Sequence, residues 1–238
     1  MKSLLTLTAL IISLTASSQF EDLVIVKVNN GKKIEGDTYQ FYAQLKNEED
    51  HIHIIFGDEY NTLSIETTAP FYQNELCGAL STNINPNVVK YDKKVKFDSF
   101  FTIGRSNSKA NSLANFNIDF SGFEERGEGF TTDNGAWYVT PDQDQAYCKE
   151  GNRFIMIMQL TTSGEVTGNL NLQGMDSDKN TWRELDRKFS TENAISKKKF
   201  DKMKKKITKA YFKELVKESN NKEKEAEKTK KVEPALKD

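Results

Sequence analysis

The sequence predicts an all-β protein, an antiparallel β-sandwich of the jelly-roll or immunoglobulin-like kind, followed by an amphipathic α-helix and a disordered charged tail. Short apolar or alternating segments follow one another with turn residues between them. No helical pattern is interleaved with these segments, so a parallel βαβ arrangement is not indicated. Beyond Leu185, apolar residues recur at three- and four-residue spacing in a lysine-rich background, which is typical of a helix.

The first 18 residues, MKSLLTLTALIISLTASS, have the pattern of a secretory signal peptide. One lysine precedes an apolar run from Leu4 to Leu14, and small residues follow that run. The run is too short for a permanent transmembrane helix, and the small residues before Gln19 form a cleavage site. We therefore expect a secreted or periplasmic protein whose mature chain begins near Gln19 and has no transmembrane segment.

Charge is distributed unevenly along the chain. Residues 19–182 hold 14 basic and 24 acidic side chains, whereas residues 183–238 hold 19 basic and 11 acidic ones. We expect a β-sandwich domain over 19–182, a basic amphipathic helix over 190–218 and a disordered tail over 219–238. The asymmetry indicates that the basic part faces an acidic partner, of which the nearest is the body of the same protein.

The first half of the expected body contains four strands. The segment Phe20–Lys27 is apolar and β-branched, and Asn30-Gly31 is a favoured two-residue hairpin turn. Three further segments with the character of strands follow it, at Asp37–Leu45, His51–Gly57 and Leu63–Thr68.

The second half contains the clearest elements. Strands are expected at Phe97–Gly104, Phe116–Phe123 and Ala136–Thr140. Arg153–Leu160 is apolar on both faces, as a central strand is, and Glu165–Gly174 alternates between apolar and polar residues. We expect these last two segments to form a hairpin across the turn Thr162-Ser163-Gly164.

Several motifs in one order allow a comparison with a known family. They are DTYQFYAQLKNEEDHIHIIFGDEYNTLSI, FYQNELCGALSTNINP, the FDSFFTIG block, NGAWYVTPDQDQA and QLTTSGEVTGNLNLQG. Over Asp37–Gly174 this arrangement resembles a domain of unknown function that recurs in secreted and surface proteins of bacteria and some algae. The resemblance implies an extracellular β-domain without an assigned activity, and it does not include the lysine-rich helix.

The expected helix carries its apolar residues on one face. These residues are Phe200, Met203, Ile207, Ala210, Tyr211 and Leu215. Ser196 is a candidate N-cap, and we expect the helix to end near Ser219. We predict that the helix packs on its own body or on a protein partner, with contact to a membrane surface or another polyanion as the alternative. Nucleic acid is not an expected partner of an exported protein.

The chain has two cysteines, Cys77 and Cys148. Because an exported protein matures in an oxidising compartment, we predict that they form one disulfide. Two free thiols are the alternative. No cofactor other than a metal ion is indicated.

Three short segments could supply metal ligands. His51 and His53 lie on one face of an expected strand, as in some zinc sites, with Asp50 or Glu49 nearby; an exposed strand face without metal is the alternative. Asp142 with Asp144, and Asp176 with Asp178, offer spaced oxygen ligands for Ca²⁺. Neither pair fits an EF-hand, and solvated turns are the alternative for both.

Aromatic residues surround the first acidic loop. Trp137, Tyr138 and Tyr147 flank Asp142 and Asp144 and form a candidate surface for a carbohydrate or a peptide, although a core tryptophan is the alternative for Trp137. No catalytic motif is present. The sequence therefore predicts an exported, non-catalytic binding or structural module for a protein or carbohydrate ligand. The alternative is an extracellular hydrolase that acts on polymers through acidic loop residues.

Overall fold

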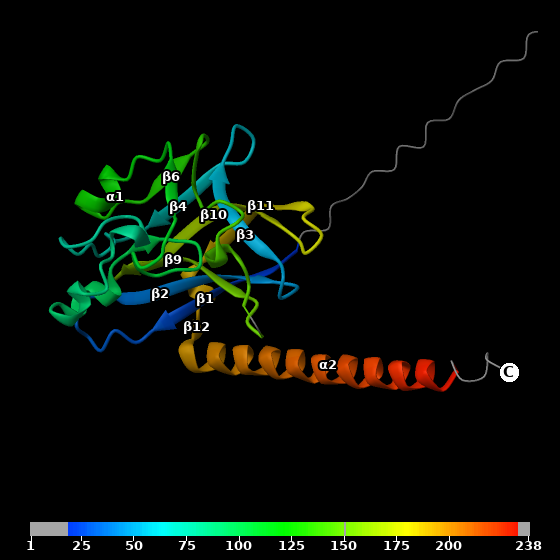
Figure 1. Cartoon of the computed structure of the whole chain (residues 1–238). Coiled ribbons are helices and arrows are strands. Elements are labelled where there is room, and N and C mark those ends of the chain that lie inside the picture. Colours follow the sequence, from blue (N-terminus) through cyan, green and yellow to red (C-terminus); the bar gives the residue numbers. More distant parts are fainter. Residues whose placement is uncertain (1–18, 150, 233–238) are drawn as a thin grey trace, which may run out of the picture.

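The computed structural model describes residues 19–149 and 151–232, so the expected signal peptide (1–18) and the last six residues of the expected tail lie outside it. The described chain is β-rich, with two mostly antiparallel sheets and a C-terminal helix, as expected (Figure 1). The first sheet contains, in spatial order, β12 (Ile195–Ser196), β1 (Phe20–Val28), β2 (Asp37–Leu45), β9 (Phe154–Thr162) and β5 (Phe100–Phe101). Only β12 runs parallel to its neighbour.

The second sheet is built around one long strand, β10 (Val166–Met175). The strands β11 (Thr181–Ser190), β3 (His51–Gly57) and β4 (Leu63–Thr67) all pair with β10 in antiparallel orientation. Three short strands complete the sheet: β8 (Gly135–Tyr138) on β3, β6 (Ala114–Phe116) on β8, and β7 (Phe130–Thr132) on β4.

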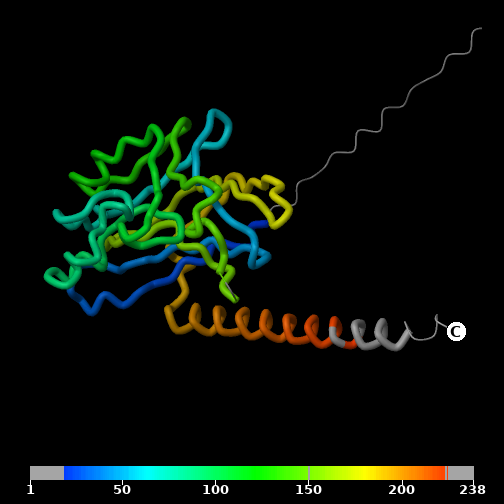
Figure 2. Tube along the Cα trace, in the orientation of Figure 1, coloured from blue at the N-terminus to red at the C-terminus, as the bar shows by residue number. Residues whose placement is uncertain are grey.

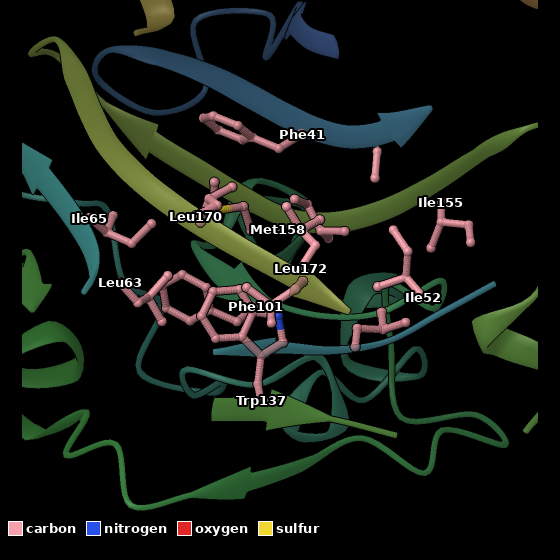
Figure 3. Packing of buried hydrophobic residues seen from close by; sticks show 14 of the residues in the cluster. Phe41, Ile52, Leu63, Ile65, Phe101, Trp137, Ile155, Met158, Leu170 and Leu172 are labelled. Carbon is pink, nitrogen blue, oxygen red and sulfur yellow. The ribbon is translucent and has the colours of Figure 1, made fainter. Parts of the chain in front are cut away.

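The main hydrophobic core is shared by the two sheets (Figure 3). Phe41 and Ile155 contribute to it from the first sheet, and Ile52, Leu172 and Trp137 contribute from the second. Because side chains alternate along a strand, β2 sends every second residue into this core, from Tyr39 to Leu45. The pairing of β2 with β9 shifts register after Phe41, and two consecutive residues of β9, Ile157 and Met158, are therefore core residues. Most of the buried hydrophobic residues of the described chain belong to this core, and removing their side chains from water holds the two sheets together.

Two other segments cover the outer face of the first sheet. The helix α2 (Lys197–Val232) covers one part of it through the cluster around Phe200, and the loop residues between Cys77 and Phe97 cover another part through the cluster around Met156. As a result, all nine residues of β9 are buried. The prediction of a central strand with two apolar faces is thus confirmed.

The remaining elements are short. They are α1 (Ser121–Arg126) and the 3₁₀ turns η1 (Ser81–Asn83), η2 (Val88–Lys90), η3 (Lys93–Phe97), η4 (Asp144–Ala146) and η5 (Thr191–Asn193). Gly127 ends α1 in the left-handed region, with φ of 66°. A Cβ at this position would lie 2.4 Å from the carbonyl oxygen of Phe71, so the close approach of these two segments requires glycine.

The structure corrects two expected boundaries. The β body does not end at residue 182, because β11 continues to Ser190 and pairs with β10 along its length. The helix begins at Lys197, not at residue 190, and it continues to Val232. Residues 219–232 are therefore helical, not disordered, which agrees with the high helix propensity of Lys, Glu and Ala and with the absence of Gly and Pro in this segment.

None of the helices within residues 19–149 and 151–232 has the length and apolar character needed to cross a membrane.

Candidate functional site

The helix α2 runs along one side of the body and continues past it (Figure 2). The helix starts where Ser196 caps it, since the Ser196 hydroxyl oxygen accepts a hydrogen bond from the Lys199 amide at 3.3 Å. The predicted N-cap is thus confirmed. Hydrophobic residues at three- and four-residue spacing form one apolar face of the helix, and this face packs on the first sheet.

The first turns of α2 are anchored by Phe200, which is 1% exposed. Its ring stacks on Tyr42 with the ring centroids 4.6 Å apart, and it meets Phe154 edge to face at 5.0 Å. Val24 and Val26 of β1 complete this cluster. Burial of the Tyr42 ring raises the pKa of its hydroxyl group to about 12, so this residue is neutral at physiological pH.

A second attachment lies two turns further along the helix. The Thr208 hydroxyl donates a hydrogen bond of 2.6 Å to the carbonyl oxygen of Gly151. Gly151 has a φ of 64°, and a Cβ there would lie 2.9 Å from the methyl group of Thr208. Only glycine therefore allows this loop to approach the helix so closely. Tyr211, which is half-buried, is the last residue of this body-facing series.

Beyond Tyr211 the described side chains of α2 are exposed. Three of them are apolar: Phe212, Leu215 and Val216 are 49%, 41% and 60% exposed. Figure 1 shows this half of the helix extending past the outline of the β body. The distal half of α2 is thus held by its connection to the anchored half and presents apolar groups to the solvent.

The face of α2 opposite the body is basic. Lys198, Lys202, Lys205, Lys209 and Lys213, which we call the lysine stripe, are all exposed. Each lies two residues from a body-facing position, and two residues correspond to a rotation of about 200° around a helix. In the described part of the chain, no carboxylate lies within ion-pairing distance of these five amines, whereas Lys197 pairs with Asp201 at 2.5 Å. The stripe therefore presents unneutralised positive charge along one line.

A groove of about 880 Å³ runs between α2 and the loops of the body. Both signs of charge line it, with Glu48, Glu49 and Glu214 near Arg153 and Lys206. Burial raises the pKa of Glu48, and the nearby Arg153 acts in the opposite direction. This side of the helix, which faces charges of both signs, contrasts with the uniformly basic stripe on the other side.

The structure separates the aromatic residues of the predicted ligand surface. Trp137 is 0% exposed, and its indole nitrogen donates to the carbonyl oxygen of Thr102 at 3.2 Å. A ligand-stacking role for Trp137 is therefore wrong, and the alternative of a core tryptophan is confirmed. Tyr138 is half-buried. Tyr147 is 38% exposed, and its ring lies on His51 with the centroids 4.4 Å apart.

The acidic residues proposed as calcium ligands lie in exposed turns. Asp142 and Asp144 are both exposed, and a hydrogen bond with Thr140 is the largest of the effects that lower the pKa of Asp142. Asp176 accepts hydrogen bonds from the amides of Asp178 and Asn180 at 3.0 and 2.8 Å. The carboxylate of Asp176 thus holds the turn between β10 and β11, and Ca²⁺ binding at either loop stays a prediction.

His51 and His53 are buried, at 3% and 9% exposure, so the alternative of an exposed strand face is wrong. Their ring centroids are 5.7 Å apart, and His53 contacts Gln173 at 3.2 Å. Burial, followed by the effect of His53, lowers the pKa of His51 to about 4, and burial lowers the pKa of His53. Among residues 19–149 and 151–232, no three His, Cys, Asp or Glu side chains gather closely enough to hold a metal ion.

The predicted disulfide is absent, since Cys77 and Cys148 are both free thiols. The physical reason is their placement: Cys77 packs with Met156 on the outer face of the first sheet, whereas Cys148 belongs to the core between the sheets. Burial raises the pKa of both thiols, that of Cys77 to about 12. Neither is therefore an activated nucleophile in this conformation.

One buried carboxyl group was not expected from the sequence. Asp98 is 0% exposed, and its Oδ1 accepts a hydrogen bond of 2.6 Å from the Asn74 amide. Burial raises the pKa of Asp98 to about 7, with the Glu124 charge as a smaller cause in the same direction. Because Asp98 has no exposed surface, a polymer cannot reach it in this conformation. The hydrolase alternative thus gains no support from this carboxyl group.

The lysine stripe could have been found in the sequence. The signal is a second series of residues at three- and four-residue spacing, made of lysines and displaced by two residues from the apolar series. It lies in a segment, 197–217, that holds ten lysines and two acidic residues. Asp98 could not have been found, because its burial depends on segments far apart in the chain.

Comparison of the chain with protein-family models, with curated proteins and with solved structures found no match. The resemblance of Asp37–Gly174 to a secreted domain of unknown function therefore stays a prediction.

Proposed function

We propose that this chain is an exported, non-catalytic binding module whose β body holds a basic helix and presents it to an anionic partner. One observation carries the proposal: α2 is anchored to the body by one face, while the opposite face carries the exposed lysine stripe. A helix that served only to cover the sheet would need no more than its first four turns. The described helix has 36 residues, and Tyr211 is the last of its half-buried side chains.

Electrostatics supports an anionic partner. The segment 197–217 holds ten lysines against Asp201 and Glu214. Surface charges of one sign raise the association rate and affinity of partners of the opposite sign, and salt screens this effect. The body itself carries an acidic excess over residues 19–182, but the lysine stripe points away from it. The partner is therefore a second molecule.

Export and the finer fold assignment belong to the same proposal. The pattern of residues 1–18 supports a cleaved signal peptide and a secreted or periplasmic location. The single core between two antiparallel sheets supports a β-sandwich, and we retain the jelly-roll or immunoglobulin-like arrangement as a proposal. Mass spectrometry of the protein recovered from the exporting cell tests the mature start at Gln19. A mass that includes residues 1–18 would contradict export with cleavage.

Binding to heparin, a linear polyanion used as a probe, tests the partner class. The wild-type chain should bind, and binding should weaken as salt rises. A variant with Lys202, Lys205, Lys209 and Lys213 changed to Gln should elute at clearly lower salt. The matched control changes four exposed lysines of the body, Lys90, Lys93, Lys94 and Lys109, to Gln. Equal loss in both variants would show that net charge, and not the lysine stripe, determines binding.

A further inference from the structure

We propose that the anionic partner of α2 is a lipid bilayer surface, on which the helix lies with the lysine stripe toward the phosphate groups. This inference rests on the proposed function and specifies its partner. It is carried by three observations on the outer side of α2: the length of the stripe, the apolar residues beside it, and the absence of the body from that side.

The lysine stripe is long and lies on the side of α2 away from the body, so all five lysines can contact one flat surface. From Lys198 to Lys213 the helix rises by roughly 22 Å, at about 1.5 Å per residue. All five amines project from the side opposite Phe200, Met203 and Ile207, which pack toward the first sheet. The β body therefore does not obstruct a flat surface that approaches the stripe, and Figure 1 shows the body on one side of the helix only.

Apolar side chains flank the stripe at its distal end. Phe212 follows Lys209 by three residues and Val216 follows Lys213 by three, so each lies next to a stripe lysine on the helix surface. They are 49% and 60% exposed. Helices that lie in a membrane interface combine lysines with aromatic and aliphatic residues that enter the boundary between head groups and acyl chains. A soluble polyanion such as an acidic polysaccharide offers phosphate-like or carboxylate charge but no apolar layer for Phe212 and Val216.

Acidic residues are placed where they do not oppose this contact. Glu214 lines the groove on the body side of the helix, and Asp201 pairs with Lys197. Asp201 lies three residues after Lys198 and four before Lys205, so it borders the lysine stripe, and its ion pair with Lys197 offsets its charge. The expected electrostatic contribution is about a fivefold gain in affinity for each lysine that comes near an anionic bilayer.

The test is co-sedimentation of the full mature chain with vesicles of phosphatidylcholine alone and with vesicles that also contain phosphatidylglycerol. We expect binding only to the anionic vesicles and a decrease at high salt. Changing Lys202, Lys205, Lys209 and Lys213 to Gln should weaken binding by roughly 100-fold or more, given about fivefold per lysine. The control with Lys90, Lys93, Lys94 and Lys109 changed to Gln should bind like wild type.

A second variant separates a membrane from a soluble polyanion. Changing Phe212 and Val216 to Ser leaves the charge unchanged, so it should reduce vesicle binding several-fold and leave heparin binding as it was. Binding to heparin without binding to anionic vesicles would overturn the membrane inference and leave the proposed function standing. Binding to neither probe would overturn both. Vesicle binding that the Phe212 and Val216 variant retains in full would also contradict the inference, since apolar contact would then play no part.

Discussion

Phe200 stacks on Tyr42 with 4.6 Å between the ring centroids and 28° between the ring planes, and this contact attaches α2 to the outer face of the first sheet. Replacing Phe200 with Ala removes a side chain that is 1% exposed. Buried Phe to Ala substitutions cost about 3–5 kcal/mol. Because Phe200 belongs to a cluster separate from the main core, we expect its loss to act mainly on the helix, with faster amide hydrogen exchange over residues 197–211 in F200A.

The matched control is Phe212, which is on the same helix but 49% exposed. Its change to Ala should alter stability by about 0.5 kcal/mol or less, as exposed substitutions usually do. It should also leave the exchange of residues 197–211 unchanged. If F200A and F212A behaved alike, α2 would not be anchored through Phe200.

The Asn171 side chain of β10 connects β10 to β3, to the loop before β4 and to β11. It is 0% exposed, and its amide nitrogen donates to the carbonyl oxygens of Phe56 and Asn61 at 3.0 and 2.8 Å. Its side-chain oxygen accepts from the amide of Asp186 at 2.9 Å. Asn171→Ala leaves these three backbone groups without the partner, so we expect a loss of about 2–4 kcal/mol in the free energy of unfolding measured with urea. The exposed Asn220 of α2 offers a control, since N220A should change the free energy of unfolding by less than about 0.5 kcal/mol.

Asp98 should make stability depend on pH. Burial raises its pKa to about 7 in the folded state, above the usual carboxyl value of about 4 in the unfolded chain. The folded state therefore binds more protons between these values. The raised pKa of Asp98 therefore contributes to the free energy of unfolding below about pH 4, and this contribution is lost as pH rises through about 7. Asp98→Asn cannot ionise, so its stability relative to wild type should increase across this range, by a few kcal/mol at most.

Asp119 is the control for this pH series. It is exposed, and hydrogen bonds with Ser121 lower its pKa, so it stays ionised from about pH 5 upward. The difference in unfolding free energy between D119N and wild type should therefore stay flat where that of D98N changes. If the difference in unfolding free energy between D98N and wild type did not change with pH, Asp98 would not be buried as a neutral acid.

The cysteines provide a direct test of a prediction that the structure corrects. In denaturant without a reducing agent, Cys77 and Cys148 should both react with an alkylating reagent, because both are free thiols. In the folded protein the reaction should be slow, since burial raises both pKa values. Alkylation that occurs only after reduction would restore the disulfide and contradict their separation in the fold.

The strands with strong patterns were predictable from local sequence. Phe20–Lys27, Asp37–Leu45 and Arg153–Leu160 correspond to β1, β2 and β9, because alternation or continuous apolar character reports directly on burial. The segment Phe116–Phe123 was misassigned as a strand. In the structure β6 ends at Phe116 and α1 begins at Ser121, where Phe123 is buried from a helix.

Elements that depend on tertiary contacts were not predictable. β11 reads TWRELDRKFS, and Asp186 within it has a φ of 53°, so a bulge breaks the alternation that marks a strand. The apolar series of α2 predicted a packing face but not the sheet it contacts. Trp137 and Tyr147 flank one acidic loop in the sequence and were predicted to share a ligand surface, yet Trp137 is in the core and Tyr147 lies on His51.

If α2 is attached by its body-facing side and binds an anionic partner through its lysine stripe, anionic vesicles should shield the stripe lysines from solvent. Acetylation of each lysine can be measured by mass spectrometry with and without such vesicles. We predict that the vesicles protect Lys198, Lys202, Lys205, Lys209 and Lys213 and leave Lys90, Lys93 and Lys109 of the body as reactive as before. Protection of the body lysines with an unprotected stripe would contradict the account.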